Sequence, residues 1–173
     1  NDLKLNNSFA SKVIVITGAS SGVGLATATL FAKEGCNLIL ASRGELALKK
    51  AAEQCRNLGA VVFYKATDMS IADNVKNLAD YAVEKFGRID VWVNNAGVMA
   101  SGKFEEIPIQ INEQVIKTNL MGYMHGAYYV LPIFKKQNEG VLINNVSIAG
   151  YMPAPFSAIY TATKHGIKWL MSA

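Results

Sequence analysis

Two residues near the end of the chain, Tyr160 and Lys164, have the types and spacing needed for proton transfer. Residues four apart in a helix share one face, so a helix here would bring the phenol and the ammonium together. An ammonium beside a phenol favours the phenolate, which could then exchange a proton with a substrate oxygen near neutral pH. The same spacing is also found in ordinary surface pairs, so the rest of the chain has to support this interpretation.

A glycine-rich turn near the start of the chain could bind phosphate. It runs from Thr17 to Gly24 with the spacing Gly-x-x-x-Gly-x-Gly, directly after the apolar, β-branched run 13–16. Such a turn lets backbone N–H groups and a helix N-terminus approach a pyrophosphate without obstruction. The alternative is a βα connection that only needs a tight turn. The helix that follows is predicted to end at Gly35 and to present one apolar face, made of Val23, Ala26, Thr27, Leu30 and Phe31.

Short apolar runs alternate with amphipathic segments along the whole chain, which predicts a parallel sheet covered by helices on both faces. The fold class is therefore α/β with a doubly wound parallel sheet. The expected strands are 13–16, 37–41, 61–64, 89–93 and 141–146. Two further helices are expected to end at Gly59 and Gly87. A long helix is expected from about Asn112 to Phe134, with one apolar face made of Ile116, Leu120, Tyr123, Ala127 and Val130. A last helix is expected to be still running at Ala173.

The unusual residues of the chain follow the expected strands. In a doubly wound sheet, ligands bind beyond the carboxyl ends of the strands, where the strand order reverses. This convergence predicts one site rather than five unrelated turns. The residues that follow strands one to five are, in order, Gly18 to Gly24, Arg43, Asp68, Asn95 and Ser147.

Taken together, these motifs resemble those of the short-chain dehydrogenase/reductase family. The matching residues are Thr17-Gly18-x-x-x-Gly22-x-Gly24, Asn94-Asn95-Ala96-Gly97, Asn119, Ser147 and Tyr160-x-x-x-Lys164, in the family's order. The resemblance covers essentially the whole chain. It implies a Rossmann fold, here expected as one dinucleotide-binding domain over residues 1–173, and an oxidoreductase that interconverts a carbonyl and an alcohol by hydride transfer.

The resemblance also implies roles for the catalytic residues. Tyr160 would be the general acid/base, and Lys164 would assist it and bind the nicotinamide ribose. Ser147 would orient the substrate oxygen, and Asn119 would hold a water that links the lysine to solvent. For Asn119 the alternative is a polar helix residue without a special role.

The cofactor-binding residues are implied in the same way. Asn95 and Ala96 would pass along the cofactor ribose, while Asp68 and Met69 would bracket adenine, although Asp68 could instead be a turn carboxylate. The full expected set is Gly18, Ser20, Ser21, Gly22, Val23, Gly24, Ser42, Arg43, Asp68, Met69, Asn95, Ala96, Gly97, Tyr160 and Lys164.

The residues after the second expected strand bear on the choice of cofactor. An NAD enzyme places a carboxylate there for the ribose 2′-hydroxyl, but this chain has Ser42 and Arg43, and its nearest acid is Glu45. A guanidinium can pair with a 2′-phosphate. NADP(H) is therefore predicted over NAD(H). The alternative is that Arg43 stacks on adenine and both cofactors bind.

Composition narrows the remaining classes. The 173 residues are 51% hydrophobic, which is enough for a core, and the net charge of +4 comes from scattered lysines, which argues against nucleic-acid binding. There is no long apolar segment, so no membrane span is expected, and a cytoplasmic location fits best. Cys36 and Cys55 are expected to be buried hydrophobes, and no metal site is indicated.

Three expectations concern the substrate, the partners and the extent of the chain. The substrate is expected to be a small apolar carbonyl or alcohol, since Met99, Met152 and Phe156 lie in loops near the site. The family resemblance implies a homo-dimer or homo-tetramer. Only five of the usual six strands are readable, so the chain is expected to lack the last strand and the C-terminal substrate cover. The alternative functions are a non-catalytic dinucleotide sensor and an inactive fragment.

Overall fold

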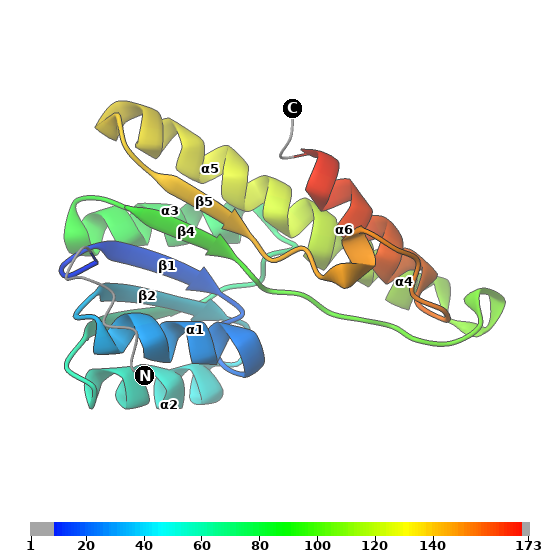
Figure 1. Cartoon of the computed structure of the whole chain (residues 1–173), viewed down its shortest axis with the longest axis horizontal. Helices are drawn as coiled ribbons and strands as arrows, with labels where there is room; N and C mark the ends of the chain where they lie inside the picture. Colours follow the sequence, from blue (N-terminus) through cyan, green and yellow to red (C-terminus); the bar gives the residue numbers. More distant parts are fainter. Residues whose placement is uncertain (1–8, 171–173) are drawn as a thin grey trace.

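The structure, a computed structural model, describes residues 9–170 and contains a parallel five-stranded sheet (Figure 1). The strand order is β3-β2-β1-β4-β5, and every neighbouring pair is parallel. This arrangement confirms the predicted doubly wound α/β fold. The strands are β1 (Val13–Thr17), β2 (Asn37–Ser42), β3 (Val61–Ala66), β4 (Val91–Asn94) and β5 (Val141–Asn144).

Helices cover both faces of the sheet (Figure 1). One face carries α1 (Gly22–Lys33) and α2 (Glu45–Arg56), and the other carries α3 (Ala72–Phe86) and α5 (Gly122–Gln137). Beyond the carboxyl ends of the strands lie α4 (Ile109–Ile116), α6 (Ala158–Leu170) and the short 3₁₀ turns η1 (Phe104–Glu106) and η3 (Ile148–Gly150). None of the helices within residues 9–170 is long and apolar enough to cross a membrane.

Alternating strand residues build two separate cores. Ile14 and Ile16 of β1 point into the core with α1 and α2, whereas Val15 between them points into the core with α3 and α5. This is the two-residue period of a strand buried on both faces. Cys36 and Cys55 are buried in the first core as free thiols, as predicted.

The apolar face predicted for α1 is mostly wrong. Val23 and Leu30 are 64% and 65% exposed, and the buried residues of this helix are Gly24, Ala28 and Ala32. Small side chains let the helix lie close to the sheet, while Val23 and Leu30 are left outside and Phe31 of the predicted face packs partly buried against the core. A prediction of the buried side of this helix from hydrophobicity alone therefore fails at Val23 and Leu30.

The long helix predicted from Asn112 to Phe134 is present but interrupted. It begins earlier, at Ile109, ends later, at Gln137, and contains a π-helical turn, η2 (Lys117–Met121). A π turn adds one residue to the helical repeat and changes which residues face the core. The predicted face is correct after the turn, where Tyr123, Ala127 and Val130 are buried. Before the turn it is wrong, because Ile116 is exposed and Asn112 and Val115 are buried instead.

Two strands differ from their predicted bounds. β4 starts at Val91 rather than Ile89, whose main-chain N–H and C=O bind the side chain of Gln137. β5 ends at Asn144 rather than Val146. The N–H of Asn145 still donates to the Asn94 carbonyl, but the Asn145 carbonyl is directed at α5 and α6. The prediction that the last helix continues to Ala173 falls outside the described residues.

A buried aspartate joins the strands at the end of the sheet opposite the carboxyl ends. The Asp90 carboxylate is 4% exposed and accepts hydrogen bonds from the Val13 N–H, from Arg88 and from Lys12. Burial raises the pKa of this carboxyl, but the bonds from Val13, Arg88 and Lys12 outweigh burial, and the pKa lies below its usual value. The ionised form thus stabilises the fold.

We expect Asp90→Asn to lower the free energy of unfolding at pH 7 by about 2 kcal/mol, the scale of a hydrogen bond to a charged group. Because the folded pKa is lowered, this stability is fully present above the unfolded pKa near 4 and is lost as the pH falls through the folded pKa. Urea unfolding between pH 7 and the acid limit should therefore show a smaller loss on acidification in Asp90→Asn than in the wild type. Asp80→Asn, which changes an exposed ion pair with Lys76, is the control. If the free energy of unfolding has the same pH dependence in the wild type and in Asp90→Asn, this account is wrong.

Candidate active site

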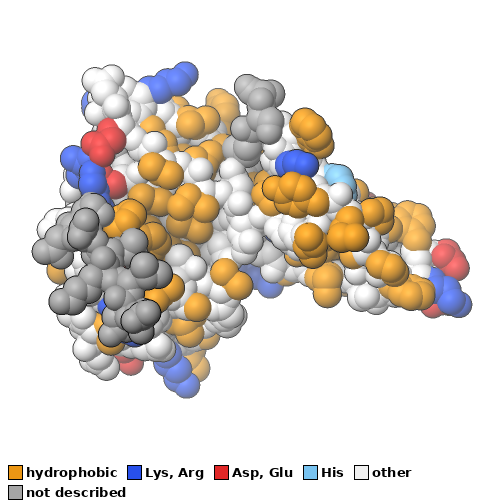
Figure 2. Space-filling model, in the orientation of Figure 1, with side chains coloured by type: hydrophobic (Ala, Val, Ile, Leu, Met, Phe, Trp, Pro, Cys, Tyr) orange, Lys and Arg blue, Asp and Glu red, His pale blue; other side chains and the backbone are white. Residues whose placement is uncertain are grey.

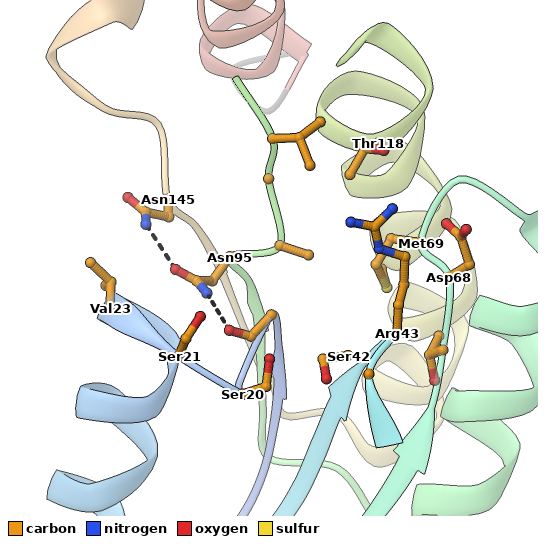
Figure 3. A pocket seen from close by; sticks show the side chains of 16 residues that line it. Ser20, Ser21, Val23, Ser42, Arg43, Asp68, Met69, Asn95, Thr118 and Asn145 are labelled. Carbon is orange, nitrogen blue, oxygen red and sulfur yellow. Dashed lines mark hydrogen bonds between the residues drawn. The ribbon is translucent and has the colours of Figure 1, made fainter. Parts of the chain in front are cut away.

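A cavity of about 460 Å³ lies at the carboxyl ends of β1, β2, β3 and β4, where the strand order reverses (Figure 3). The residues of the predicted cofactor-binding set that line it are Gly18, Ser20, Ser21, Val23, Ser42, Arg43, Asp68, Met69, Asn95, Ala96 and Gly97. It is also lined by residues that the sequence did not single out, namely Gly44, Thr67, Val98, Thr118 and Asn145.

The glycine turn forms one wall of the cavity and needs glycine for two reasons. Gly18 has a left-handed φ of +65°, and a Cβ there would lie 2.8 Å from the Cα of Ala96. A Cβ on Gly24 would collide with the Gly18 carbonyl. The first turn of α1 can therefore pack directly on the end of β1.

The N-terminus of α1 faces this wall without a capping group. Its N-cap residue, Ser21, makes no side-chain capping hydrogen bond, and the first turn holds no acidic residue. Orphan N–H groups and the positive end of a helix dipole suit an anion. Since nothing lies within 4 Å of a Cβ built on Gly22, the approach to these groups is open, and the turn fits the pyrophosphate of a dinucleotide.

Asn95 connects the glycine turn to β5. Its side-chain nitrogen donates to the carbonyls of Thr17 (2.9 Å) and Gly18 (3.4 Å), and its side-chain oxygen accepts from the Asn145 amide at 2.9 Å (Figure 3). The Thr17 hydroxyl also accepts from the N–H groups of Asn95 and Ala96. These bonds fix the Asn95–Ala96 segment against the turn.

The end of β2 supplies the polar groups on the opposite side of the cavity. The exposed Arg43 side chain points into the cavity, with its guanidinium directed toward Met69 and Thr118 (Figure 3). The Ser42 hydroxyl is buried and has no hydrogen-bond partner among the described residues. Both groups are thus available to a ligand on this side of the cavity.

Asp68 has a structural role in addition to lining the cavity. One carboxylate oxygen accepts from the N–H and the hydroxyl of Ser70, which is the turn role that the sequence left open. The other oxygen has no recorded partner within residues 9–170. Met69 beside it is held from α5, because its carbonyl lies 3.1 Å from Nδ1 of His125.

Lys164 lies in α6 as a buried cation, 4% exposed. Its Nζ donates to the Asn145 carbonyl at 2.7 Å and to the Tyr123 hydroxyl at 3.3 Å. It also lies 5.7 Å from the ring centroid of Tyr160, so the predicted pair shares one region of the helix surface. Burial lowers the pKa of Lys164 to about 8.

Ser147 lies between β5 and η3 in a backbone conformation that is uncommon for a residue with a side chain. Its φ is +78°, and its hydroxyl accepts from the N–H of Ala149 at 3.3 Å. Positive φ at non-glycine residues is concentrated at functional sites. The serine is half-buried and retains its hydroxyl proton for another partner.

Asn119 is fully buried in the π turn and uses its side chain to hold a loop. Its oxygen accepts from the Val98 N–H and its nitrogen donates to the Val98 carbonyl, both at 2.8 Å, with a further contact to Thr163. The side chain thus ties the segment after β4 to the π turn. Both of its polar atoms are engaged.

The structure does not place all the predicted residues on one surface. Gly22, Gly24, Asn119, Ser147, Tyr160 and Lys164 do not line the 460 Å³ cavity. Asn145 connects the two groups, because its side chain lines the cavity and its carbonyl binds Lys164. Asn145 and Tyr123 were missed as site residues. Within residues 9–170, no group of three or more His, Cys, Asp or Glu side chains could hold a metal ion.

Known proteins resemble this chain in sequence. A family model described as short chain dehydrogenase matches residues 12–173. An uncharacterized oxidoreductase of Listeria monocytogenes is 39% identical over 162 residues, which cover 93% of this chain and 65% of that protein. The chain therefore spans about two thirds of the length of this relative.

Solved structures agree with the sequence match. A short-chain dehydrogenase/reductase from Burkholderia phymatum in complex with NAD has a TM-score of 0.92 and 40% identity, covering 95% of this chain and 59% of that one. Actinorhodin polyketide ketoreductase with NADPH has a TM-score of 0.89 and 31% identity, covering 92% and 62%. The relatives thus include an NAD complex and an NADPH complex.

Proposed function

Because this chain belongs to the short-chain dehydrogenase family, we propose that residues 1–173 form one dinucleotide-binding domain of an oxidoreductase that interconverts a carbonyl and an alcohol. The observation that carries this proposal is the position of Asn145. It joins the cavity that fits a dinucleotide to the buried Lys164, which lies beside Tyr160.

The cofactor proposed for the cavity is NADP(H), with NAD(H) as the less favoured alternative. When bound, the nicotinamide donates or accepts the hydride. The glycine turn with Ser20, Ser21 and Val23 would hold the pyrophosphate. Ser42 and Arg43 would hold the 2′-phosphate, Asp68 and Met69 the adenine, and Asn95, Ala96 and Gly97 the ribose.

Tyr160 is proposed to transfer the proton to or from the substrate oxygen. Lys164 favours the phenolate through its charge, and one of its three N–H groups remains for the nicotinamide ribose. The positive φ of the Ser147 backbone sets the direction of its side chain, and the hydroxyl would orient the substrate oxygen. Because both side-chain atoms of Asn119 are engaged with Val98, we assign the proposed role in holding water to its main chain.

The substrate is proposed to be a small apolar carbonyl or alcohol. Apolar side chains are exposed on the part of the molecule formed by α4, α6 and the neighbouring loops (Figure 2). The loops that carry them meet where the Gly102 N–H donates to the Phe156 carbonyl at 2.8 Å. The residues concerned are Met99, Phe104, Tyr151, Met152 and Phe156.

A homo-dimer or homo-tetramer is proposed on the exposed side of α5 and of the end of η2. The apolar residues Met121, Met124, Tyr128 and Leu131 recur at three- to four-residue spacing on this side and are exposed. Such a stripe is typical of a helix that packs on another helix. A cytoplasmic location is proposed from the two free thiols.

A hydride-transfer assay tests the proposed activity. A panel of apolar ketones, aldehydes and alcohols is incubated with each cofactor, and the absorbance of the reduced nicotinamide is followed. Turnover that depends on NADP(H) supports the enzyme. Cofactor binding by calorimetry without turnover of any compound, in this chain and in a longer natural chain containing it, would favour the non-catalytic sensor.

We expect Arg43→Asp to shift the preference from NADPH toward NADH by at least about tenfold. The change removes a charged hydrogen bond to the 2′-phosphate, worth about 1.5–3 kcal/mol, and adds repulsion. Dissociation constants for both cofactors give the ratio. Lys49→Asp makes the same charge change on an exposed part of α2 and should leave the ratio unaltered. An unaltered ratio in Arg43→Asp would place the 2′ group elsewhere.

A further inference from the structure

A second buried tyrosine contacts the lysine of the proposed site. Tyr123 of α5 is 1% exposed and has no part in the proton transfer proposed above. Its hydroxyl lies 3.3 Å from Nζ of Lys164, and its ring centroid lies 4.9 Å from the same atom. The ammonium is therefore closer to the Tyr123 ring than to the Tyr160 ring, at 5.7 Å.

The hydrogen-bond directions at this contact are fixed by a shared acceptor. The Tyr123 hydroxyl donates to the Asn145 carbonyl at 3.1 Å, and Lys164 donates to the same carbonyl at 2.7 Å. Since the phenolic proton is used on Asn145, the phenolic oxygen can only accept from Lys164. The ammonium thus meets two oxygen acceptors and an aromatic face, all of which favour the charged form.

We propose that Tyr123 is a positioning residue for Lys164, holding the ammonium against the Asn145 carbonyl at the border of the dinucleotide cavity. This inference rests on the proposed function, because it gives Lys164 a role in catalysis. The Asn145 side chain is bonded to Asn95, and Asn95 is bonded to the glycine turn. Tyr123 therefore fixes the lysine relative to the wall that would hold the cofactor, and leaves one N–H group of Lys164 for the ligand.

The surroundings of Lys164 explain why a second acceptor matters. Burial lowers the pKa of Lys164 to about 8, and burial raises the pKa of Tyr123 well above its usual value, so the phenol stays neutral. Among the described residues, no carboxylate makes an ion pair with Lys164. On the elements packed against α6, Glu113 of α4 pairs with Lys117 of η2 at 4.0 Å on the surface.

The other titratable groups near this helix are phenols or lie on α6 itself. Tyr160 faces Lys164 from the preceding turn, and Tyr151, next to η3, contacts Lys168 instead. His165 bonds the Thr161 carbonyl within the helix. Oxygen acceptors rather than a carboxylate thus maintain the charge of Lys164, and the loss of one acceptor disfavours it.

The test is the titration of Lys164 in Tyr123→Phe, which removes the hydroxyl and keeps the ring. We expect the titration to move to lower pH by about one unit, the scale of one charge-assisted hydrogen bond. It is followed through the ¹³Cε resonance of Lys164, assigned with Lys164→Arg, in the chain without cofactor. This readout does not depend on turnover.

Tyr129→Phe is the matched control, because Tyr129 lies on the same helix, packs against the core and makes no side-chain hydrogen bond within residues 9–170. An unaltered Lys164 titration in Tyr123→Phe, or an equal shift in Tyr129→Phe, would overturn the inference. If Tyr123→Phe does not fold, Tyr123→Leu, which has an apolar side chain without an acceptor for the ammonium, gives the same comparison.

Kinetics separate the failure of this inference from the failure of the proposed function. In Tyr123→Phe, the alkaline limb of the pH–kcat profile should shift to lower pH, as the Lys164 titration does. The factor by which kcat falls should be larger than the factor by which the KM for the cofactor rises. If the wild type turns over none of the compounds with either cofactor, the proposed function is wrong, and the Lys164 titration still decides the positioning role. If Lys164→Ala retains full activity, the role of Lys164 in catalysis is wrong, and the positioning role of Tyr123 falls with it. If Lys164→Ala is inactive and Tyr123→Phe has the pH profile of the wild type, only the positioning role is wrong.

Discussion

Tyr160→Phe is expected to lower kcat by about 100- to 10,000-fold, the range for the loss of a general acid/base. The substitution removes the only atom of the side chain that can exchange a proton. The affinity for the cofactor should change little, because the proposed phosphate and adenine contacts come from the cavity residues, and the proposed ribose contacts come from those residues and Lys164. Steady-state kinetics on a chain that shows turnover, together with calorimetric titration of NADPH, provide the two measurements.

The control for this prediction is Tyr81→Phe, which removes a phenolic hydroxyl from α3, outside the proposed site, and keeps the ring. It should retain kcat within about threefold, as is usual for a change away from the chemistry. A Tyr160→Phe protein that keeps more than a tenth of the wild-type kcat would have to use another proton donor.

Gly24→Ala is expected to reduce both stability and cofactor binding. The new Cβ would collide with the Gly18 carbonyl and lie 2.6 Å from the side-chain nitrogen of Asn95, so either the glycine turn or the start of α1 must move. Overpacking of this kind costs about 1–3 kcal/mol of unfolding free energy. Moving the turn also displaces the N–H groups proposed for the pyrophosphate, and the Kd for NADPH should rise at least tenfold.

Gly44→Ala is the matched control, because Gly44 also lines the cavity but has ordinary backbone angles and nothing within 4 Å of a built Cβ. Thermal unfolding and NADPH titration of both variants give the comparison. Wild-type stability and Kd in Gly24→Ala would show that the turn tolerates a Cβ and does not need the close packing described here.

Strand positions and helix ends were predictable from the sequence because each depends on local signals. The β-branched run 13–16 is buried on both faces, and Gly35, Gly59 and Gly87 have the positive φ that ends a helix. The convergence of polar groups at the strand ends was also predictable, because parallel strands bring their carboxyl ends to one edge.

The residues that were missed depend on tertiary contacts. The buried side of α1 is set by how closely Ala28 and Ala32 allow the helix to approach the sheet, which hydrophobicity does not report. The π turn at Lys117–Met121 has no sequence signal that we recognise, yet it decides that Val115 rather than Ile116 is buried. Tyr123 was read correctly as a buried residue, but its hydrogen bond to Lys164 joins segments 41 residues apart.

The central position of β1 has a consequence for how the molecule assembles during synthesis. Val15 pairs with Ile39 on one side and with Trp92 on the other, so one edge of the first strand is completed early and the other must wait for β4 to emerge. An open apolar edge is prone to pair with other chains, and non-local pairing slows folding. Asn95 to Gly97 follow β4 directly, so the wall that faces the glycine turn is the part of the cavity that forms late. A nascent chain that has not yet reached Asn95 contains the glycine turn but lacks the segment whose hydrogen bonds hold that turn in place.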